Sequence, residues 1–126
     1  MTKAVHPDVL DKGPIEIKTA ANILHLVPTA TAATYAATVA ASIFNVAMAS
    51  GDYALSTSGS NRVLTTTSKT ATATGNAAAS IGLEWRFCDS ATSRLLWQTN
   101  ESSGAAVASG SQYSAPVLTA TSVQPV

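Results

Sequence analysis

The sequence predicts a mainly β protein, in which an N-terminal helix is followed by an antiparallel β-sandwich or barrel. Ala, Thr and Ser supply 56 of the 126 residues, and Thr in runs favours extended backbone. Short apolar stretches separated by turn residues recur about every ten residues, as in sandwiches and barrels. The length fits one domain, which we assign to residues 1–126, with an N-terminal arm and helix over 1–21 and the β-sandwich or barrel over 22–126.

The beginning of the chain has the pattern of an interrupted helix. Asp8 can cap a first turn, and Gly13-Pro14 ends it, so a second helical piece is expected to start at Pro14. Residues 22–28, NILHLVP, follow as a strand with apolar side chains on both faces. Such a strand is expected inside a sheet, with both faces partly covered.

Residues 29–44, TATAATYAATVAASIF, are ambiguous. Alanine favours helix, the β-branched residues favour strand, and the apolar positions fit neither period. We expect a loop that can hold a short helix. No formally charged residue occurs from Thr19 to Gly51, but the stretch is rich in Ala and Thr and lacks Lys or Arg flanks. A membrane span is therefore not expected.

The remainder of the chain predicts strands separated by turns. Ala-Ser-Gly-Asp, Gly-Ser-Asn and Gly-Asn provide the turn signals. The expected strands are IFNVAM (43–48), DYALSTS (52–58), RVLTTTSK (62–69), TATAT (70–74), AAASIGLEWRF (77–87) and QYSAPVLTATSV (112–123).

The densest patch, IGLEWRFCDSATSRLLWQ over residues 81–98, predicts a β-hairpin around the polar connection DSATS. Its inner face is expected to supply bulk to the core, because the rest of the chain has mostly small side chains. On its outer face, Glu84, Arg86 and Arg94 are expected to pair across the strands. The predicted core residues are Ile81, Leu83, Trp85, Phe87, Leu95 and Trp97, and the opposite face carries Gly82, Cys88, Leu96 and Gln98 as well.

The sequence offers no arrangement of residues typical of catalysis. The two histidines, His6 and His25, lie in an expected first turn and an apolar strand, and no G-x-S-x-G or Walker motif occurs. A lone cysteine, Cys88, excludes a multi-cysteine metal site. Zero formal net charge without a basic stripe argues against nucleic-acid binding. We expect no enzyme, and no catalytic, cofactor-binding or metal-binding residues.

Several stretches resemble a family of small virion proteins encoded among the structural genes of tailed double-stranded-DNA bacteriophages. The similarity begins with VHPDVLDKG and IKTAANILHLVP and resumes at VAMASGDYALS and NRVLTTTS. It continues through the strand ending in Asp89, SRLLWQT and AVASGSQYSAPVLTATSV, and leaves out mainly residues 29–42. Pro14 and the bulky Glu84-Trp85-Arg86-Phe87 depart from the family pattern. The resemblance implies a virion component, with no catalytic residues to carry over.

A capsid decoration or cement protein on the outer surface of the major capsid lattice is the favoured function. Such a protein, made in the cytoplasm of the host bacterium, is expected to be a homotrimer on threefold positions, without contact to nucleic acid or membrane. A neck, tail or fibre-associated protein is an alternative. Another is a host-surface carbohydrate-binding module using Trp85, Trp97, Tyr53 and Tyr113. The candidate assembly contacts are Met1, Thr2, Lys3, Ala4, Val5, Tyr35 and Val39, with the uncharged segment 29–42 and an exposed sheet edge.

Overall fold

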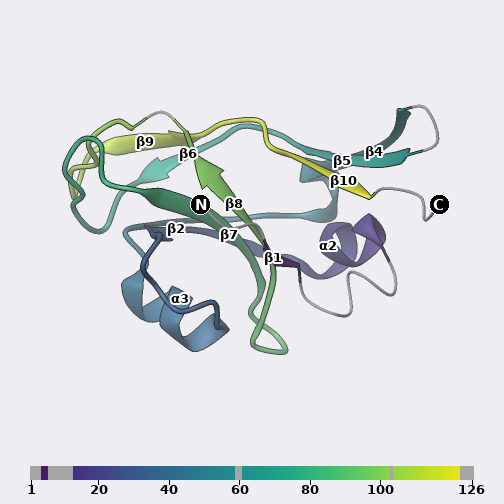
Figure 1. The fold of residues 1–126 in the computed structure, drawn as a ribbon, viewed down its shortest axis with the longest axis horizontal. Coiled ribbons are helices and arrows are strands. Elements are labelled where there is room, and N and C mark those ends of the chain that lie inside the picture. Colours follow the sequence, from purple (N-terminus) through teal and green to yellow (C-terminus); the bar gives the residue numbers. More distant parts are fainter. Residues whose placement is uncertain (1–3, 6–12, 59–60, 103, 123–126) are drawn as a thin grey trace.

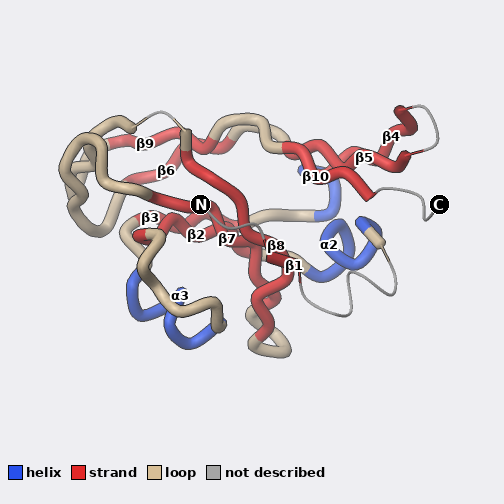
Figure 2. The backbone as a smooth tube through the Cα atoms, in the orientation of Figure 1, coloured by secondary structure: helices blue, strands red, loops and turns tan. Residues whose placement is uncertain are grey.

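A computed structural model describes residues 4–5, 13–58, 61–102 and 104–122, and the mainly β, antiparallel fold expected from the sequence is confirmed (Figures 1 and 2). The helices are α2 (Pro14–Ala20), α3 (Tyr35–Ala41) and the short 3-10 helix η1 (Ser50–Asp52). The strands are β1 (Ala4–Val5), β2 (Ile23–Pro28), β3 (Phe44–Ala47), β4 (Tyr53–Ser58), β5 (Asn61–Thr66), β6 (Lys69–Thr72), β7 (Leu83–Asp89), β8 (Arg94–Glu101), β9 (Gln112–Ala115) and β10 (Thr119–Ser122).

One layer is a five-stranded antiparallel sheet with the order β1-β8-β7-β2-β3. As the apolar residues on both faces of 22–28 predicted, β2 lies inside the sheet, between β7 and β3. The helix expected to start at Pro14 begins there, because proline has the backbone angle of a first helical residue and needs no hydrogen-bond acceptor. The earlier turn predicted around Asp8 lies outside the described residues.

The second layer is built on a long antiparallel ribbon. β5 pairs with β10 and β6 pairs with β9, both in the same register, so residues 62–72 run against residues 112–122 from end to end. The sequence predicted a single strand over 112–123. That prediction is wrong in detail: the strand divides around Pro116, which has no N–H to donate to a ladder. At the break, Thr66 accepts from the Leu118 N–H through its Oγ1 at 2.9 Å and donates its own N–H to the Leu118 carbonyl at 2.9 Å.

Aromatic side chains join the two layers. Tyr113 of β9 packs edge-on against Phe44, with ring centroids 5.8 Å apart, and also contacts Trp85 at 6.0 Å. Tyr53 of β4 lies 6.0 Å from Phe87, which stacks on Trp97 at 4.8 Å. These rings supply the bulk that the many small residues cannot, so the core is concentrated around them.

Each helix covers a different part of the sheets. α2 buries Ile17 in the core and contacts β4, β5, β7 and β10, so it lies against both layers. Within residues 29–44, where the sequence allowed a short helix, the structure forms α3. The Thr34 side chain caps this helix by accepting from the Ala37 N–H at 3.2 Å. α3 lies on the side of the five-stranded sheet away from the second layer (Figure 1).

The predicted hairpin is formed by β7 and β8, but two of its six predicted core residues lie elsewhere. Ile81 is 47% exposed because β7 begins only at Leu83. Leu95 is half-buried because a bulge interrupts the pairing: Cys88 opposes Leu95, whereas Phe87 opposes Trp97. The extra residue, Leu96, is fully buried in the core instead. Leu83, Trp85, Phe87 and Trp97 are buried there, as expected.

The bulge predicts opposite sensitivities for two neighbouring leucines. Leu96→Ala should lower the free energy of unfolding by about 2–5 kcal/mol, since it leaves a cavity in the core. Leu95→Ala should lower it by less than half as much, because its half-buried side chain opposes Cys88 outside the core cluster. Urea unfolding followed by tryptophan fluorescence measures both. Equal losses, or a larger loss for Leu95→Ala, would contradict the bulged register.

Candidate functional site

A row of polar residues crosses the face of the five-stranded sheet that points away from the core. Asn45, His25, Arg86 and Gln98 occupy opposed positions on β3, β2, β7 and β8. His25 is 4% exposed, Arg86 0% and Gln98 3%. A β-strand places alternate residues on opposite faces, so this row lies back to back with the aromatic core. We call His25, Glu84, Arg86 and Gln98 the buried polar row; Glu84 stands two residues before Arg86.

Arg86 connects the sheet to the chain segment that lies over it. Its Nη1 donates to the Ala32 carbonyl at 2.6 Å and to Thr38 Oγ1 at 2.9 Å. Its Nη2 donates to the Thr31 carbonyl at 2.7 Å and forms an ion pair with Glu84 Oε1. A planar guanidinium can serve several acceptors at fixed angles. One cation therefore holds both the loop before α3 and α3 itself.

The expected outer-face pairing of Glu84, Arg86 and Arg94 across the strands is wrong. Glu84 and Arg86 pair along a single strand and are 2% and 0% exposed. Alternation in a sequence separates two faces but does not tell which one is covered. Here residues 29–42 cover the polar face, because Arg86 satisfies carbonyl groups of that segment.

His25 holds the other end of α3. Ser42 is the C-cap of α3, and its Oγ donates to the Phe44 carbonyl at 2.9 Å. We assign the single hydroxyl hydrogen to that bond, so that His25 Nδ1–H donates to Ser42 Oγ at 2.8 Å. In the neutral ring, this assignment leaves the lone pair on Nε2. Burial lowers the pKa of His25 below its usual 6.5.

This histidine–serine contact does not have the geometry of a catalytic dyad. A serine nucleophile needs its proton directed at the base, whereas the Ser42 proton is directed at a carbonyl. Within the described residues, no group of three or more His, Cys, Asp or Glu side chains is placed to hold a metal ion. The sequence could have indicated a covered His25, since it lies in a strand with apolar residues on both faces.

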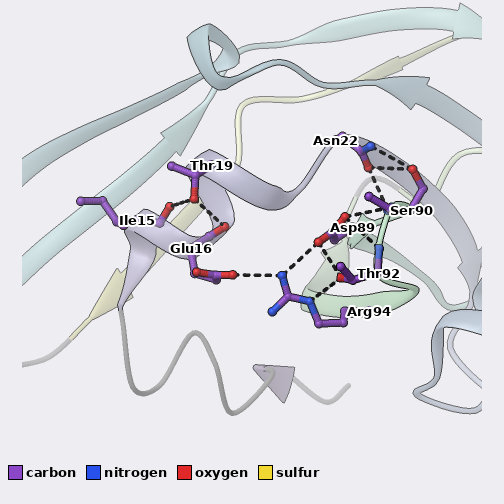
Figure 3. Close-up of polar contacts among 9 residues, drawn as sticks. Ile15, Glu16, Thr19, Asn22, Asp89, Ser90, Thr92 and Arg94 are labelled. Carbon is purple, nitrogen blue, oxygen red and sulfur yellow. Dashed lines mark hydrogen bonds and ion pairs between the residues drawn. The ribbon is translucent and has the colours of Figure 1, made fainter.

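A second polar cluster ties the tip of the β7–β8 hairpin to α2 and to Asn22, which directly precedes β2 (Figure 3). Arg94 Nη2 pairs with Asp89 Oδ2 at 2.9 Å and with Glu16 Oε1 at 3.0 Å. Asn22 accepts from the Ser90 N–H at 3.0 Å. Although burial opposes it, hydrogen bonds from the Thr92 side chain, Arg94 and backbone N–H groups of the turn lower the pKa of Asp89. All these groups are mutually satisfied, so the cluster orients the hairpin.

The remaining predicted contact residues have different surroundings. Met1, Thr2 and Lys3 lie outside the described residues. Ala4 and Val5 form β1, whose backbone pairs with Gln98 and Trp97 of β8, so this part of the arm belongs to the sheet. Of the other two candidates, Tyr35 is half-buried and Val39 is 46% exposed.

The fold brings parts of three uncharged segments to one end of the molecule, at the left and lower left in Figure 1. No formally charged residue occurs in 19–51, 70–83 or 102–126. Ala77 and Val107 exchange backbone hydrogen bonds at 2.9 Å, Thr74 N–H donates to the Ile43 carbonyl at 2.8 Å, and Thr29 N–H donates to the Gly82 carbonyl at 3.0 Å. We call the exposed parts of 29–42, 72–82 and 104–112 the charge-free end. Glu101, which borders it, is half-buried and accepts from the Tyr113 hydroxyl at 2.9 Å.

The aromatic residues considered as a sugar-binding platform are largely inaccessible. Trp85, Trp97 and Tyr53 are 0%, 3% and 2% exposed, and only Tyr113 of the four is partly accessible. A ring must present its face to stack on a sugar. The hypothesis of a carbohydrate-binding platform is therefore wrong for Trp85, Trp97 and Tyr53.

No helix within the described ranges is both long and apolar enough to cross a membrane. Comparison with protein-family models, curated proteins and solved structures finds no match.

Removing the charge of Arg86 alone should destabilise the fold more than removing the charges of both Arg86 and Glu84. Arg86→Met should cost about 3–5 kcal/mol of unfolding free energy, because Glu84 is left charged and buried. The matched double variant Glu84→Gln/Arg86→Met should cost less than the single one, since neither charge of the buried pair remains. Urea unfolding compares the two. A double variant as unstable as Arg86→Met would contradict this account of the pair.

Cys88 should be unreactive in the folded protein. Burial raises the pKa of its thiol to about 12, so at pH 8 the thiolate fraction is on the order of a thousand times smaller than for an ordinary cysteine. Ellman's reagent should modify the thiol only in urea concentrations that unfold the chain. Rapid modification of the native protein would show that Cys88 is accessible.

Proposed function

We propose that this chain is a non-enzymatic structural component of a tailed-phage virion, decorating the exterior of the capsid by binding to the major capsid lattice. The sequence resemblance to small phage virion proteins is one support. The observation that carries the proposal further is the charge-free end, which joins three segments that are far apart in the chain.

A charge-free surface of small residues suits repeated contact with a neighbouring protein. Burying a charge without a partner in an interface is costly, and this end has no formal charge to bury. Small side chains lose little conformational freedom when they are covered. Val39 and Ile81, 46% and 47% exposed, add apolar area on two of its segments.

The attachment of α3 supports a role in binding through a preformed surface. Arg86 and His25 fix α3 to the sheet through hydrogen bonds at both ends, so the helix surface is held in one position. The buried histidine–serine pair has no nucleophilic geometry. The fixed helix suits binding through a preformed surface, and the histidine–serine geometry supports a non-enzymatic role.

Charges introduced at the charge-free end should weaken assembly. Val39→Glu and Ser109→Glu change exposed residues there, and each should lower the affinity for purified heads of the encoding phage, stripped of this protein, more than about tenfold. Ser56→Glu, an exposed position on β4, is the matched control and should bind normally. Co-sedimentation measures the affinities. Failure of the unaltered protein to bind heads would overturn the proposal, and equal binding by all variants would exclude the charge-free end as the contact.

The solution mass separates capsid decoration from a position in the neck or tail. A trimer, measured by light scattering after gel filtration, is expected for a threefold position on the capsid. A six- or twelvefold ring would contradict decoration and favour the neck or tail. A monomer that trimerises only on heads would be seen as threefold density in images of decorated particles.

A further inference from the structure

The segment over the buried polar row is attached by hydrogen bonds far more than by apolar burial. Of the residues in α3, only Thr38 is buried. Arg86 holds Thr31, Ala32 and Thr38, and His25 holds Ser42. A seven-residue helix is not stable by itself in water. Residues 29–42 therefore depend on these attachments, and local opening of such a segment requires less energy than global unfolding.

One of the attachments includes a titratable group in an environment that disfavours its charged form. With Nδ1–H donated to Ser42, an added proton must go to Nε2 of His25. That nitrogen is buried and has no hydrogen-bond partner within the described part of the chain. Arg86 occupies the directly opposed position on β7, so protonation would place a second cation beside a permanent one.

The other neighbours do not balance that charge. Among the described residues facing His25, β7 also contributes Glu84 and Cys88, two positions to either side of Arg86, while β3 contributes Asn45. Glu84 is already paired with Arg86, and the Cys88 thiol is protonated at neutral pH. Residues 29–42 contain no charged side chain.

We propose that residues 29–42 form an acid-released flap, in which protonation of His25 at Nε2 frees α3 from the five-stranded sheet while the aromatic core stays folded. The mechanism does not depend on the proposed function. If both hold, acid would remove one of the three segments of the charge-free end, so attachment to a partner would weaken at low pH.

The direction of the pH dependence follows from where His25 binds its proton more strongly. In the closed form, burial holds the pKa of His25 below 6.5, whereas in an open flap the exposed ring has its usual value near 6.5. The closed form is therefore fully favoured above pH 6.5. As the pH falls below 6.5, the ratio of open to closed flap should rise by up to about tenfold per pH unit, until the closed-state pKa is reached.

A spin label on the flap tests this directly. Val39→Cys gives an exposed site on α3, and the buried Cys88 should not compete for the label. Ser56→Cys on β4 is the matched control, and both are made in a His6→Gln background, so that His25 is the only histidine. Between pH 7.5 and 5, the label at 39 should become mobile and the label at 56 should not. Simultaneous mobilisation of both labels, or of neither, would overturn the proposal.

His25→Asn identifies the titrating group. The Asn amide can donate to Ser42 as Nδ1–H does, but it cannot take up a proton in this range. The flap should then stay closed to pH 5. A transition that persists would refute the role of His25 and assign the effect to another titrating group.

If the Asn variant does not fold, nuclear magnetic resonance of the unsubstituted protein decides. The His25 ring and the Ala37 methyl group, on α3, should then titrate with the same midpoint, and different midpoints would overturn the proposal.

Discussion

The guanidinium of Arg86 is a permanent positive charge without access to water, and acceptors surround its two terminal nitrogens. A cation in such a place is tolerated only when acceptors surround it in suitable directions. Two carbonyl groups and a hydroxyl come from residues 31–38, and a carboxylate comes from its own strand. The charge of Arg86 thus holds the covering segment in place. Without these hydrogen bonds, little would keep an Ala- and Thr-rich segment on this face, because α3 buries only Thr38. The ordering of α3 and the shape of the charge-free end both depend on that cation.

The bulky side chains are divided between two tasks in a chain where small residues predominate. Trp85, Phe87 and Trp97 face the second layer and, with Phe44, Tyr53 and Tyr113, form the contacts between sheets. The intervening residues of β7 face the opposite way and carry the polar row. β7 is consequently buried over its whole length. One strand therefore contributes to an apolar core on one face and to the buried polar row on the other.

The local pattern predicted most of the strands, though not all of their bounds, together with the start of α2 at Pro14 and the β7–β8 hairpin, because each depends on neighbours in the sequence. It did not predict the exchange of Leu95 for Leu96, since a bulge is fixed by the register with the partner strand. Nor did it reveal that Glu84 and Arg86 are covered, because the cover comes from a segment some fifty residues earlier. The sequence also did not reveal the charge-free end, because only the fold brings the described parts of 72–82 and 104–112 to the same end of the molecule as 29–42. Each of these features depends on contacts between segments that are far apart in the sequence.

The long ribbon has a kinetic consequence. Its two strands, residues 62–72 and 112–122, enclose the whole β7–β8 hairpin between them along the chain. Pairing of distant segments requires the closure of a long loop, which is slow compared with the closing of a short hairpin. The hairpin should therefore be formed before the ribbon closes, and its aromatic face is then exposed until β9 arrives with Tyr113. During that interval the unpaired edges of β5 and β6 are open to another chain, so refolding at high concentration should favour intermolecular exchange of the segment 112–122.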